Sequence, residues 1–195
     1  MIRYHRLFII IGLILLFSCE NHNKEILSNS TSEELLAMFQ EDQAVRTGKI
    51  EVESIKSGKK RRLRVLELLS QNKINSAQDK MYAAYILQHT SLRYCGEKLV
   101  SSSPENCYLA HKLACESLKM GNEQARQLVA ATIDRYLVYT KGIQKYGTQR
   151  GYNSETGQEY LLSIDSTTTD AERKKYGVPP LNELKKKYPF NESGG

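Results

Sequence analysis

Acidic, basic and hydrogen-bonding side chains gather in three short segments of the chain: QH at 88–89, DR at 134–135 and QKYGTQ at 144–149. A histidine titrates near neutral pH and can act as an acid, a base or a ligand, and a carboxylate can orient its ring. Amide and hydroxyl groups on a glycine-containing turn suit the recognition of a sugar, an amide or a peptide. The candidate binding or catalytic residues are therefore His89, Asp134, Arg135, Gln144, Tyr146, Thr148 and Gln149.

Three interpretations of this set stay open. In a structural role, Asp134, Arg135 and Gln149 would tie the C-terminal part of the chain to the helices through buried hydrogen bonds. In a binding role, the same region would present a polar groove to a partner or a small ligand. In a catalytic role, His89 would work with Asp134 and the segment Gln144–Gln149. The catalytic hypothesis requires His89, Asp134 and Gln149 to converge on one open pocket, whereas complete burial and mutual hydrogen bonding would favour the structural role.

The cysteines raise two questions: whether three side chains bind a metal, and whether two cysteines form a disulfide. Cys107, His111 and Cys115 recur every four residues near one face of a predicted helix, and residues at i and i+4 can bind zinc together. Three such ligands in a row drift around a helix, so we expect packing, with no metal and no cofactor. Cys95 and Cys107 flank a loop, and in an oxidising compartment we expect a disulfide between them. Cys115 lies about 12 Å from Cys107 by helical rise, so it would stay a buried thiol.

Residues 1–18 have the features of an export signal. Arg3 and Arg6 precede an apolar stretch over 7–17, which is too short to span a bilayer. The tetrapeptide LFSC at 16–19 resembles a bacterial lipobox, although its phenylalanine is larger than the usual residue. The resemblance implies cleavage before Cys19, a diacylglycerol on its thiol, and several acyl chains such as palmitate that together hold the protein on a membrane. An ordinary secretory signal with a free Cys19 is the alternative.

The charge of the chain is mildly basic. The net charge is +6, and removal of the signal leaves 26 basic and 22 acidic side chains, a net charge of +4. The basic residues are partly local, in runs over 59–64 and 185–187. We expect a solvated helix face or contact with anionic lipid headgroups, and no nucleic acid, because an exported lipoprotein rarely meets it. The expected partners are the membrane, through the lipid anchor, and an unknown protein or small-molecule ligand.

Helical periodicity dominates the middle of the chain. After Gly142 the pattern changes, and a small hairpin is predicted, with 145–152 and 158–164 flanking the loop 153–157. Capping-box spacing occurs at Thr31 with Glu34, at Ser76 with Asp79 and at Thr169 with Glu172. The predicted helices are Ser32–Thr47, Lys59–Gln71, Ala77–Tyr94, Asn106–Met120, Asn122–Lys141, a short helix ending at Tyr176, and Leu181–Lys187.

The expected fold is mainly α, a small helical bundle or short repeat-like α domain with an irregular C-terminal extension. The signal peptide would cover 1–18, a flexible tether 19–31, the single helical domain 32–190 and a frayed tail 191–195. The run over 109–131, LAHKLACESLKMGNEQARQLVAA, resembles one Sel1 or tetratricopeptide-type repeat, in which two helices join through a Gly-Asn turn.

A wider resemblance rests on spaced motifs. The set QH, DR, Q-x-Y-G-T-Q and D-x-x-R-x-x-x-G-x-x-x-L, the last over 170–181, is similar to an uncharacterised bacterial family, domain of unknown function 6624. It covers about residues 35–184, and Y-G-T-Q is its most specific part. The family has no established activity, so the resemblance implies site positions and no reaction. Other members often carry a Trp-Pro segment where this chain has residues 72–76, which puts any role of that corner in doubt.

The sequence therefore leads to two function hypotheses. The first is a lipid-anchored protein of the bacterial cell envelope, on the periplasmic or surface side, whose helices present a polar binding site near the DR and YGTQ segments. The alternative is an envelope enzyme, similar to a hydrolase, that uses His89 with Asp134 and the segment Gln144–Gln149. The signatures of the commonest hydrolases, nucleotide-binding proteins and zinc proteases (G-x-S-x-G, P-loop, Rossmann glycines, H-E-x-x-H) are missing from the sequence.

Overall fold

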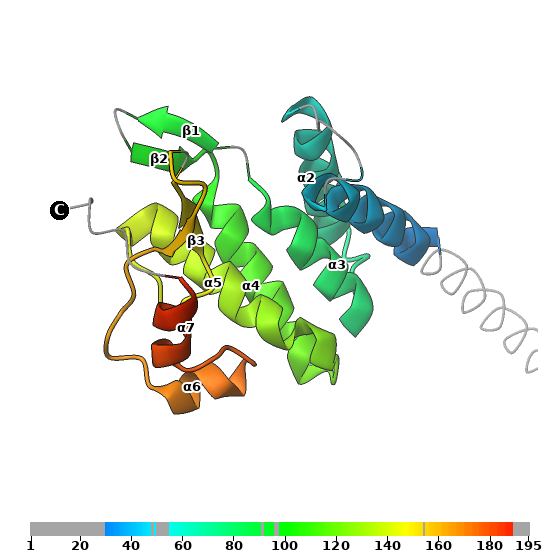
Figure 1. Cartoon of the computed structure of the whole chain (residues 1–195). Helices are drawn as coiled ribbons and strands as arrows, with labels where there is room; N and C mark the ends of the chain where they lie inside the picture. Colours follow the sequence, from blue (N-terminus) through cyan, green and yellow to red (C-terminus); the bar gives the residue numbers. More distant parts are fainter. Residues whose placement is uncertain are drawn as a thin grey trace, which may run out of the picture.

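A computed structural model of the chain describes residues 30–47, 49, 55–90, 92–95, 98–153 and 155–188, with no side-chain description at 55, 92–95 and 98–100. The structure is mainly helical, as predicted (Figure 1). The signal peptide, the lipobox, nearly all of the tether and the tail 191–195 lie outside the described residues. A helix over residues 30–46 precedes α2 (Ile55–Ser70), α3 (Ala77–Gln88), α4 (Pro104–Lys119), the 3-10 turn η1 (Glu123–Ala125), α5 (Arg126–Lys141), α6 (Asp170–Lys175) and α7 (Leu181–Lys187).

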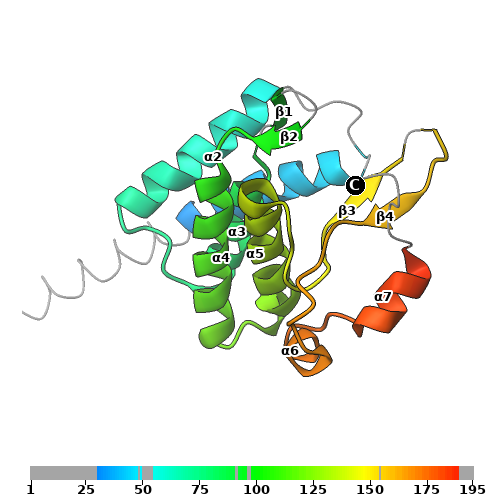
Figure 2. The same ribbon diagram turned by 90° about the vertical axis from the view of Figure 1, so that its left-hand side faces the viewer.

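The core lies around α4, which packs extensively on α3 on one side and on α5 on another. Figure 2 shows α4 and α5 running side by side. Small residues allow α3 and α4 to approach closely. Ala84 of α3 and Ala114 of α4 are fully buried, and the hydroxyl of Ser117 on α4 donates to the carbonyl of Ala77 on α3 at 2.6 Å. The buried apolar cluster consists of Leu35, Val65, Leu68, Ile74, Met81, Ala83, Ala84, Ile86, Leu87, Ala110, Leu113, Ala114, Ala125, Leu128 and Val129.

The helix over residues 30–46 is fixed to α2 and α3 by polar and aromatic contacts. Arg64 of α2 donates to both carboxylate oxygens of Glu34, at 2.6 and 2.9 Å. Phe39 stacks on Tyr82 of α3, with ring centroids 4.7 Å apart. Thr31 lies inside this helix and not at its N-cap, so the cap predicted from Thr31 and Glu34 is wrong.

The helix α3 is shorter than predicted. It ends at Gln88, and the residues expected to continue it form β1 (Leu92–Cys95), which pairs antiparallel with β2 (Lys98–Ser101). The carbonyls at the end of α3 accept hydrogen bonds from distant arginines: Arg62 donates to His89 O at 2.6 Å and Arg135 to Gln88 O at 3.3 Å. These tertiary contacts satisfy carbonyl groups that a helix end leaves unpaired, so α3 can stop there.

The turns around α4 and α5 follow the sequence signals. Gly121 adopts a φ of 91°, and the side chain of Asn122 accepts from the N–H of Gln124, which forms the predicted Gly-Asn turn. The helix α5 ends at Gly142 in the left-handed conformation, with a φ of 72°.

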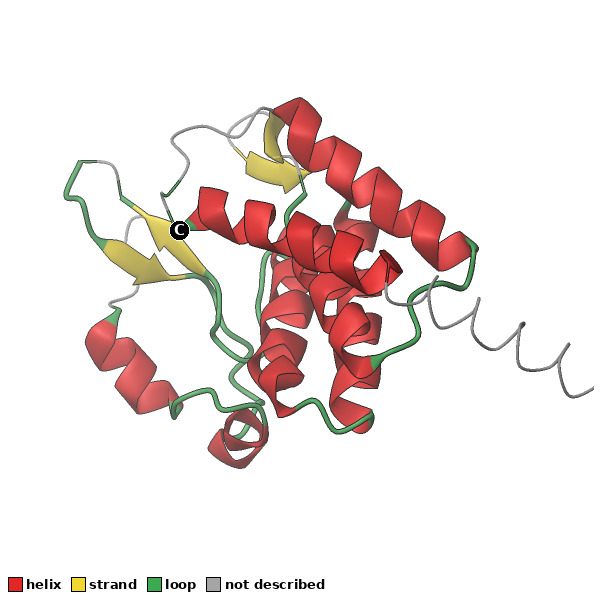
Figure 3. Ribbon diagram, turned by 90° about the vertical axis from the view of Figure 1, so that its right-hand side faces the viewer, coloured by secondary structure: helices red, strands yellow, loops and turns green. Residues whose placement is uncertain are grey.

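The C-terminal part folds back on α5 from one side of the helical core (Figures 1 and 3). Its strands β3 (Arg150–Tyr152) and β4 (Glu159–Leu161) form the predicted hairpin. The capping box of Thr169 and Glu172 opens α6, also as predicted. A second apolar cluster joins this part to α5 and contains Ala130, Tyr146, Leu161, Val178 and Leu184. Among the described residues, no helix combines the length and apolar character needed to cross a membrane.

The close packing of α3 on α4 leads to a stability prediction. We expect Ala114→Leu to lower the free energy of unfolding by about 1–3 kcal/mol, because extra methylenes would enter a filled core at a fully buried position. The matched control is Ala37→Leu, the same change at an exposed position of the helix over 30–46. Urea unfolding followed by circular dichroism measures both, and equal losses would contradict this account of the core.

Candidate functional site

Asp134 organises the loop that contains the YGTQ motif. This carboxylate is fully buried on α5. Its Oδ1 accepts the backbone N–H groups of Lys145 and Tyr146, both at 2.8 Å. Its Oδ2 accepts both the N–H and the hydroxyl of Thr148, at 2.9 and 2.8 Å. Four donors occupy the carboxylate, so Asp134 holds the loop and has no free lone pair to aim at a histidine.

Gln144 supports the same loop from within. It is fully buried, and its amide nitrogen donates to the carbonyls of Gln149 and Leu162, at 2.9 and 3.0 Å. Its side-chain oxygen accepts the N–H of Gln149 at 2.8 Å. Tyr146 packs edge-on against Tyr176, and burial raises its pKa. The structural role expected for Asp134 therefore fits the structure, and it extends to Gln144 and Tyr146.

Arg173 of α6 completes the support of the loop. It is 1% exposed and donates to the carbonyl of Tyr146 at 3.2 Å and to the carbonyl of Thr168 at 2.6 Å. The loop is thus fixed from two sides, by a buried carboxylate on its N–H groups and by a buried guanidinium on a carbonyl.

Arg135 follows Asp134 but binds different elements. Its Nε donates to the side-chain oxygen of Gln149 at 3.1 Å, and another guanidinium N–H donates to Gln88 O at 3.3 Å. Gln149 also donates to the carbonyl of Ala131 at 3.2 Å. Arg135 therefore links the YGTQ loop to the end of α3. Among the described residues its hydrogen-bond partners are neutral, and it forms no ion pair there.

His89 contacts Asp42 and not Asp134. The pairing of His89 with Asp134, which the enzyme hypothesis requires, is therefore wrong. The Nδ1 of His89 lies 2.6 Å from Oδ2 of Asp42, which is 2% exposed on the helix over 30–46. Asp42 follows Phe39 by three positions and Leu35 by seven, so it belongs to the buried face of its helix. A carboxylate in an apolar stripe is the sequence signal that could have identified it.

The surroundings of His89 favour its neutral form. Burial lowers its pKa, the hydrogen bond and charge of Asp42 oppose this change, and the positive charges of Arg135 and Arg46 lower the pKa further. A carboxylate can only accept, so the proton of the neutral ring lies on Nδ1. The lone pair is then on Nε2, which has no hydrogen-bond partner within the described part of the chain.

Cys107 lies under the same corner. Its sulfur is fully buried, 3.6 Å from Gln88 O, and burial raises its pKa to about 11, so it is neither a thiolate nor a ready nucleophile. Cys107 is a free thiol in this structure, which counts against the disulfide expected with Cys95. The side chain of Cys95 itself lies outside the described residues. Buried contact with the end of α3 gives Cys107 a packing role that needs no partner sulfur.

The other two members of the cysteine–histidine series have local partners. His111 Nδ1 lies 3.0 Å from the carbonyl of Val129, and the sulfur of Cys115 lies 3.6 Å from His111 Nε2. Burial lowers the pKa of His111 and raises that of Cys115. In the described ranges, no three histidine, cysteine or acidic side chains are placed to hold a metal ion together.

A pocket of about 310 Å³ opens beside the YGTQ loop. We call it the loop pocket. Its apolar wall includes Val178, Pro179 and Leu184, and its charged side chains are Arg150 and Lys187. The remaining lining residues are Gln127, Ala131, Gly147, Thr148, Gly177 and Tyr188. The candidate set therefore divides: Thr148 reaches the loop pocket, Arg135 and Gln149 join the corner near His89, and Asp134, Gln144 and Tyr146 support the loop.

Comparisons of the chain with protein-family models, with curated proteins and with solved structures find no match. The resemblance to domain of unknown function 6624 therefore stays a prediction that rests on the motifs alone.

The four hydrogen bonds of Asp134 predict a large effect of a nearly isosteric change. Asp134→Asn would place an amide donor against N–H groups that need an acceptor. We expect it to lower the free energy of unfolding by about 3 kcal/mol, since buried donors would lose their partners. Glu183→Gln, an equivalent change at an exposed position of α7, is the control. Urea unfolding measures both, and a loss below that of the control would contradict the role given to Asp134.

The lowered pKa of His89 predicts how stability depends on pH. Below the ordinary histidine pKa of about 6.5, the unfolded chain binds a proton that folded His89 resists, so stability falls as the pH falls. His89→Asn keeps an N–H donor to Asp42 but cannot titrate. We expect this variant to lose less stability than the natural chain between pH 7 and pH 5, measured by urea unfolding at each pH. His111→Asn reports the separate contribution of the other histidine with a lowered pKa. Identical pH profiles for His89→Asn and the natural chain would refute the assignment.

Proposed function

We propose that this chain is a lipid-anchored protein of the bacterial cell envelope that binds a small ligand in the loop pocket. The observation that carries the binding proposal is the composition of that pocket. The pocket is lined by two cations, Arg150 and Lys187, and by apolar side chains, and no carboxylate is among the described residues that line it. This arrangement suits a ligand with an apolar body and one anionic group, such as a carboxylate. A volume of about 310 Å³ lies at the small end of ordinary ligand sites, roughly 300–1,000 Å³.

The rigidity of the pocket wall supports the proposal. Thr148, in the wall, is held by two hydrogen bonds to Asp134, and the neighbouring Tyr146 carbonyl is held by Arg173. On the opposite side, Gln127 donates to the carbonyl of Gly177 at 3.1 Å. A site whose walls are already fixed loses little conformational entropy when a ligand enters.

A cation–π contact positions Arg150, one of the two cations of the loop pocket. The guanidinium of Arg150 lies 4.1 Å from the ring centroid of Tyr188, which also lines the pocket. Among the described residues, Arg150 forms an ion pair only with Glu159, at 3.9 Å, and that carboxylate is half exposed. A contact of that length at the surface contributes little. The charge of Arg150 thus remains available to an anionic ligand.

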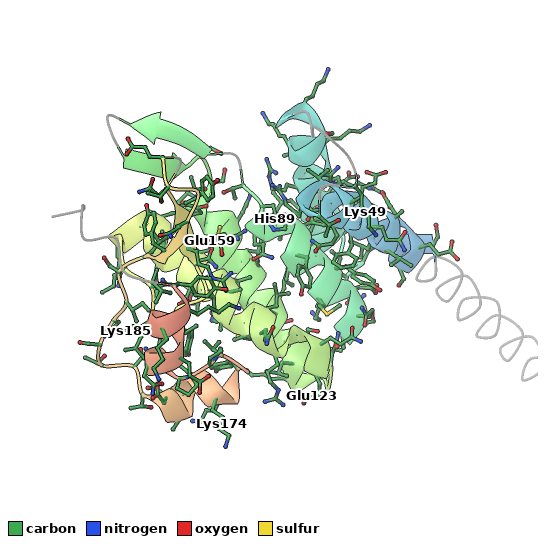
Figure 4. The ribbon with its side chains drawn as sticks, viewed as in Figure 1. Lys49, His89, Glu123, Glu159, Lys174 and Lys185 are labelled. Atoms are coloured by element: carbon green, nitrogen blue, oxygen red, sulfur yellow. The ribbon has the colours of Figure 1, made fainter. Side chains whose placement is uncertain are left out.

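The ligand proposal is tested with benzoate and its neutral isostere benzamide. We expect benzoate to shift the backbone amide resonances of Gly147 and Gly177 in the purified full chain, and benzamide to shift them much less. Arg150→Gln and Lys187→Gln should each weaken benzoate binding several-fold, because each removes one cation. Lys174→Gln is the control, since Lys174 is exposed on α6 and points away from the rest of the chain (Figure 4). Equal shifts from the two compounds would contradict an anion site, and no shift from either would contradict the pocket.

The lipid anchor is tested separately. Cys19→Ala should move the protein from the membrane fraction to the soluble fraction of cells and abolish incorporation of labelled palmitate, because it removes the proposed acylated thiol. Cys115→Ala is the matched control and should leave both properties unchanged. If Cys19→Ala leaves the protein in the membrane fraction, the lipoprotein proposal is contradicted, whereas the loop pocket proposal is unaffected.

A further inference from the structure

The corner where α3 ends joins three elements around His89. Asp42 comes from the helix over 30–46, Gln88 and His89 from the end of α3, and Arg135 from α5. We call this group the His89 corner. Figure 4 shows His89 at the end of α3. The corner is separate from the loop pocket, since none of these four residues lines that pocket.

Two acceptors in this corner have no donor within the described residues. The side-chain oxygen of Gln88 is buried without a hydrogen-bond partner, and Gln88 is only 5% exposed. The Nε2 of His89 has no hydrogen-bond partner among the described residues either, but it belongs to a side chain that is 11% exposed and is not fully buried. A buried acceptor without a donor, such as the Gln88 oxygen, is rare in folded proteins. This oxygen, together with Nε2 of the next residue, favours a ligand that brings its own O–H or N–H groups.

A positive charge lies next to these acceptors. Arg135 donates to Gln88 O and to Gln149, both neutral, and its charge is close enough to His89 to lower the pKa of the ring. The positive charge of Arg46 also lowers the pKa of the ring, Arg62 donates to His89 O, and burial raises the pKa of the Cys107 thiol. An arginine with only neutral described partners favours an anion. The ligand that fits the corner is thus negatively charged and also donates a hydrogen bond.

We propose that the His89 corner binds a protonated phosphate group, either free phosphate or a phosphomonoester. The anionic oxygens pair with Arg135, and a P–O–H group donates to Nε2 of His89 or to the side-chain oxygen of Gln88. Asp42 has a positioning role, because its hydrogen bond keeps the proton on Nδ1 and leaves Nε2 as an acceptor. The same geometry discriminates against sulfate, which is a tetrahedral anion like phosphate but has no proton to donate at neutral pH.

The test compares phosphate with sulfate, on the purified full chain at pH 6.0, where phosphate and its monoesters carry a proton. Calorimetric titration gives the Kd of each anion, and the ¹⁵N resonance of His89 Nε2 shows whether the ring accepts a hydrogen bond. We expect phosphate to bind at least tenfold more tightly than sulfate and to shift that resonance. Glycerol phosphate is the second arm: binding tighter than that of free phosphate assigns the site to phosphomonoesters, and weaker binding assigns it to the free anion.

Two variants separate recognition from folding. His89→Asn keeps the donor to Asp42 but removes the Nε2 acceptor, so the preference for phosphate should fall to within about twofold while sulfate binding remains. Arg135→Gln should weaken both anions at least tenfold. Arg150→Gln, in the loop pocket, should change neither, which keeps the two proposals independent. Equal affinity for phosphate and sulfate in the natural chain, or binding of neither, would overturn the proposal, as would an unchanged preference in His89→Asn.

Discussion

A buried carboxylate needs donors on every side, and this requirement at Asp134 shapes the C-terminal half of the molecule. Taking a charged carboxylate out of water is costly unless hydrogen bonds replace the lost hydration. Here the replacements are three backbone N–H groups and one hydroxyl, all from residues 145–148. The chain after α5 must therefore turn back at once, and the left-handed Gly142 permits that turn. The hairpin and the short helices α6 and α7 then pack on α5 in a position that the carboxylate has set.

The neighbouring arginine extends this constraint to the rest of the helical core. Successive residues of a helix point about 100° apart, so Asp134 and Arg135 reach different elements. The carboxylate binds the loop, whereas the guanidinium binds Gln149 at the end of the loop and Gln88 at the end of α3. The expectation that this couple joins the C-terminal extension to the helices is met by these contacts. One dipeptide thus connects three segments that are far apart in the sequence.

Local signals predicted much of the fold, because the residues that decide a cap or a turn are adjacent in sequence. Thr169 with Glu172, Gly142 and the loop at 153–157 each had the expected effect. The end of α3 was not predictable in this way, since arginines 27 and 47 residues away satisfy its carbonyls. The partner of His89 was missed for the same reason: Asp42 is 47 residues away and became its partner only when the helices packed. Pattern identified the polar residues of the site, but tertiary packing decided their pairing.

Gln149 gives the two proposed sites a common physical dependence. The buried carboxylate fixes Thr148, which accepts a hydrogen bond from the Gln149 amide at 3.1 Å, and Gln149 in turn accepts the Nε of Arg135. A guanidinium on a flexible stem can serve an anion only if its orientation is held, and here the holding group comes from the loop that forms one wall of the loop pocket. The YGTQ segment therefore contributes to both sites. Gly147 and Thr148 line the loop pocket, and Gln149 positions Arg135 in the His89 corner. Residues of this loop whose hydrogen bonds are internal to the protein thus set the geometry of both proposed sites.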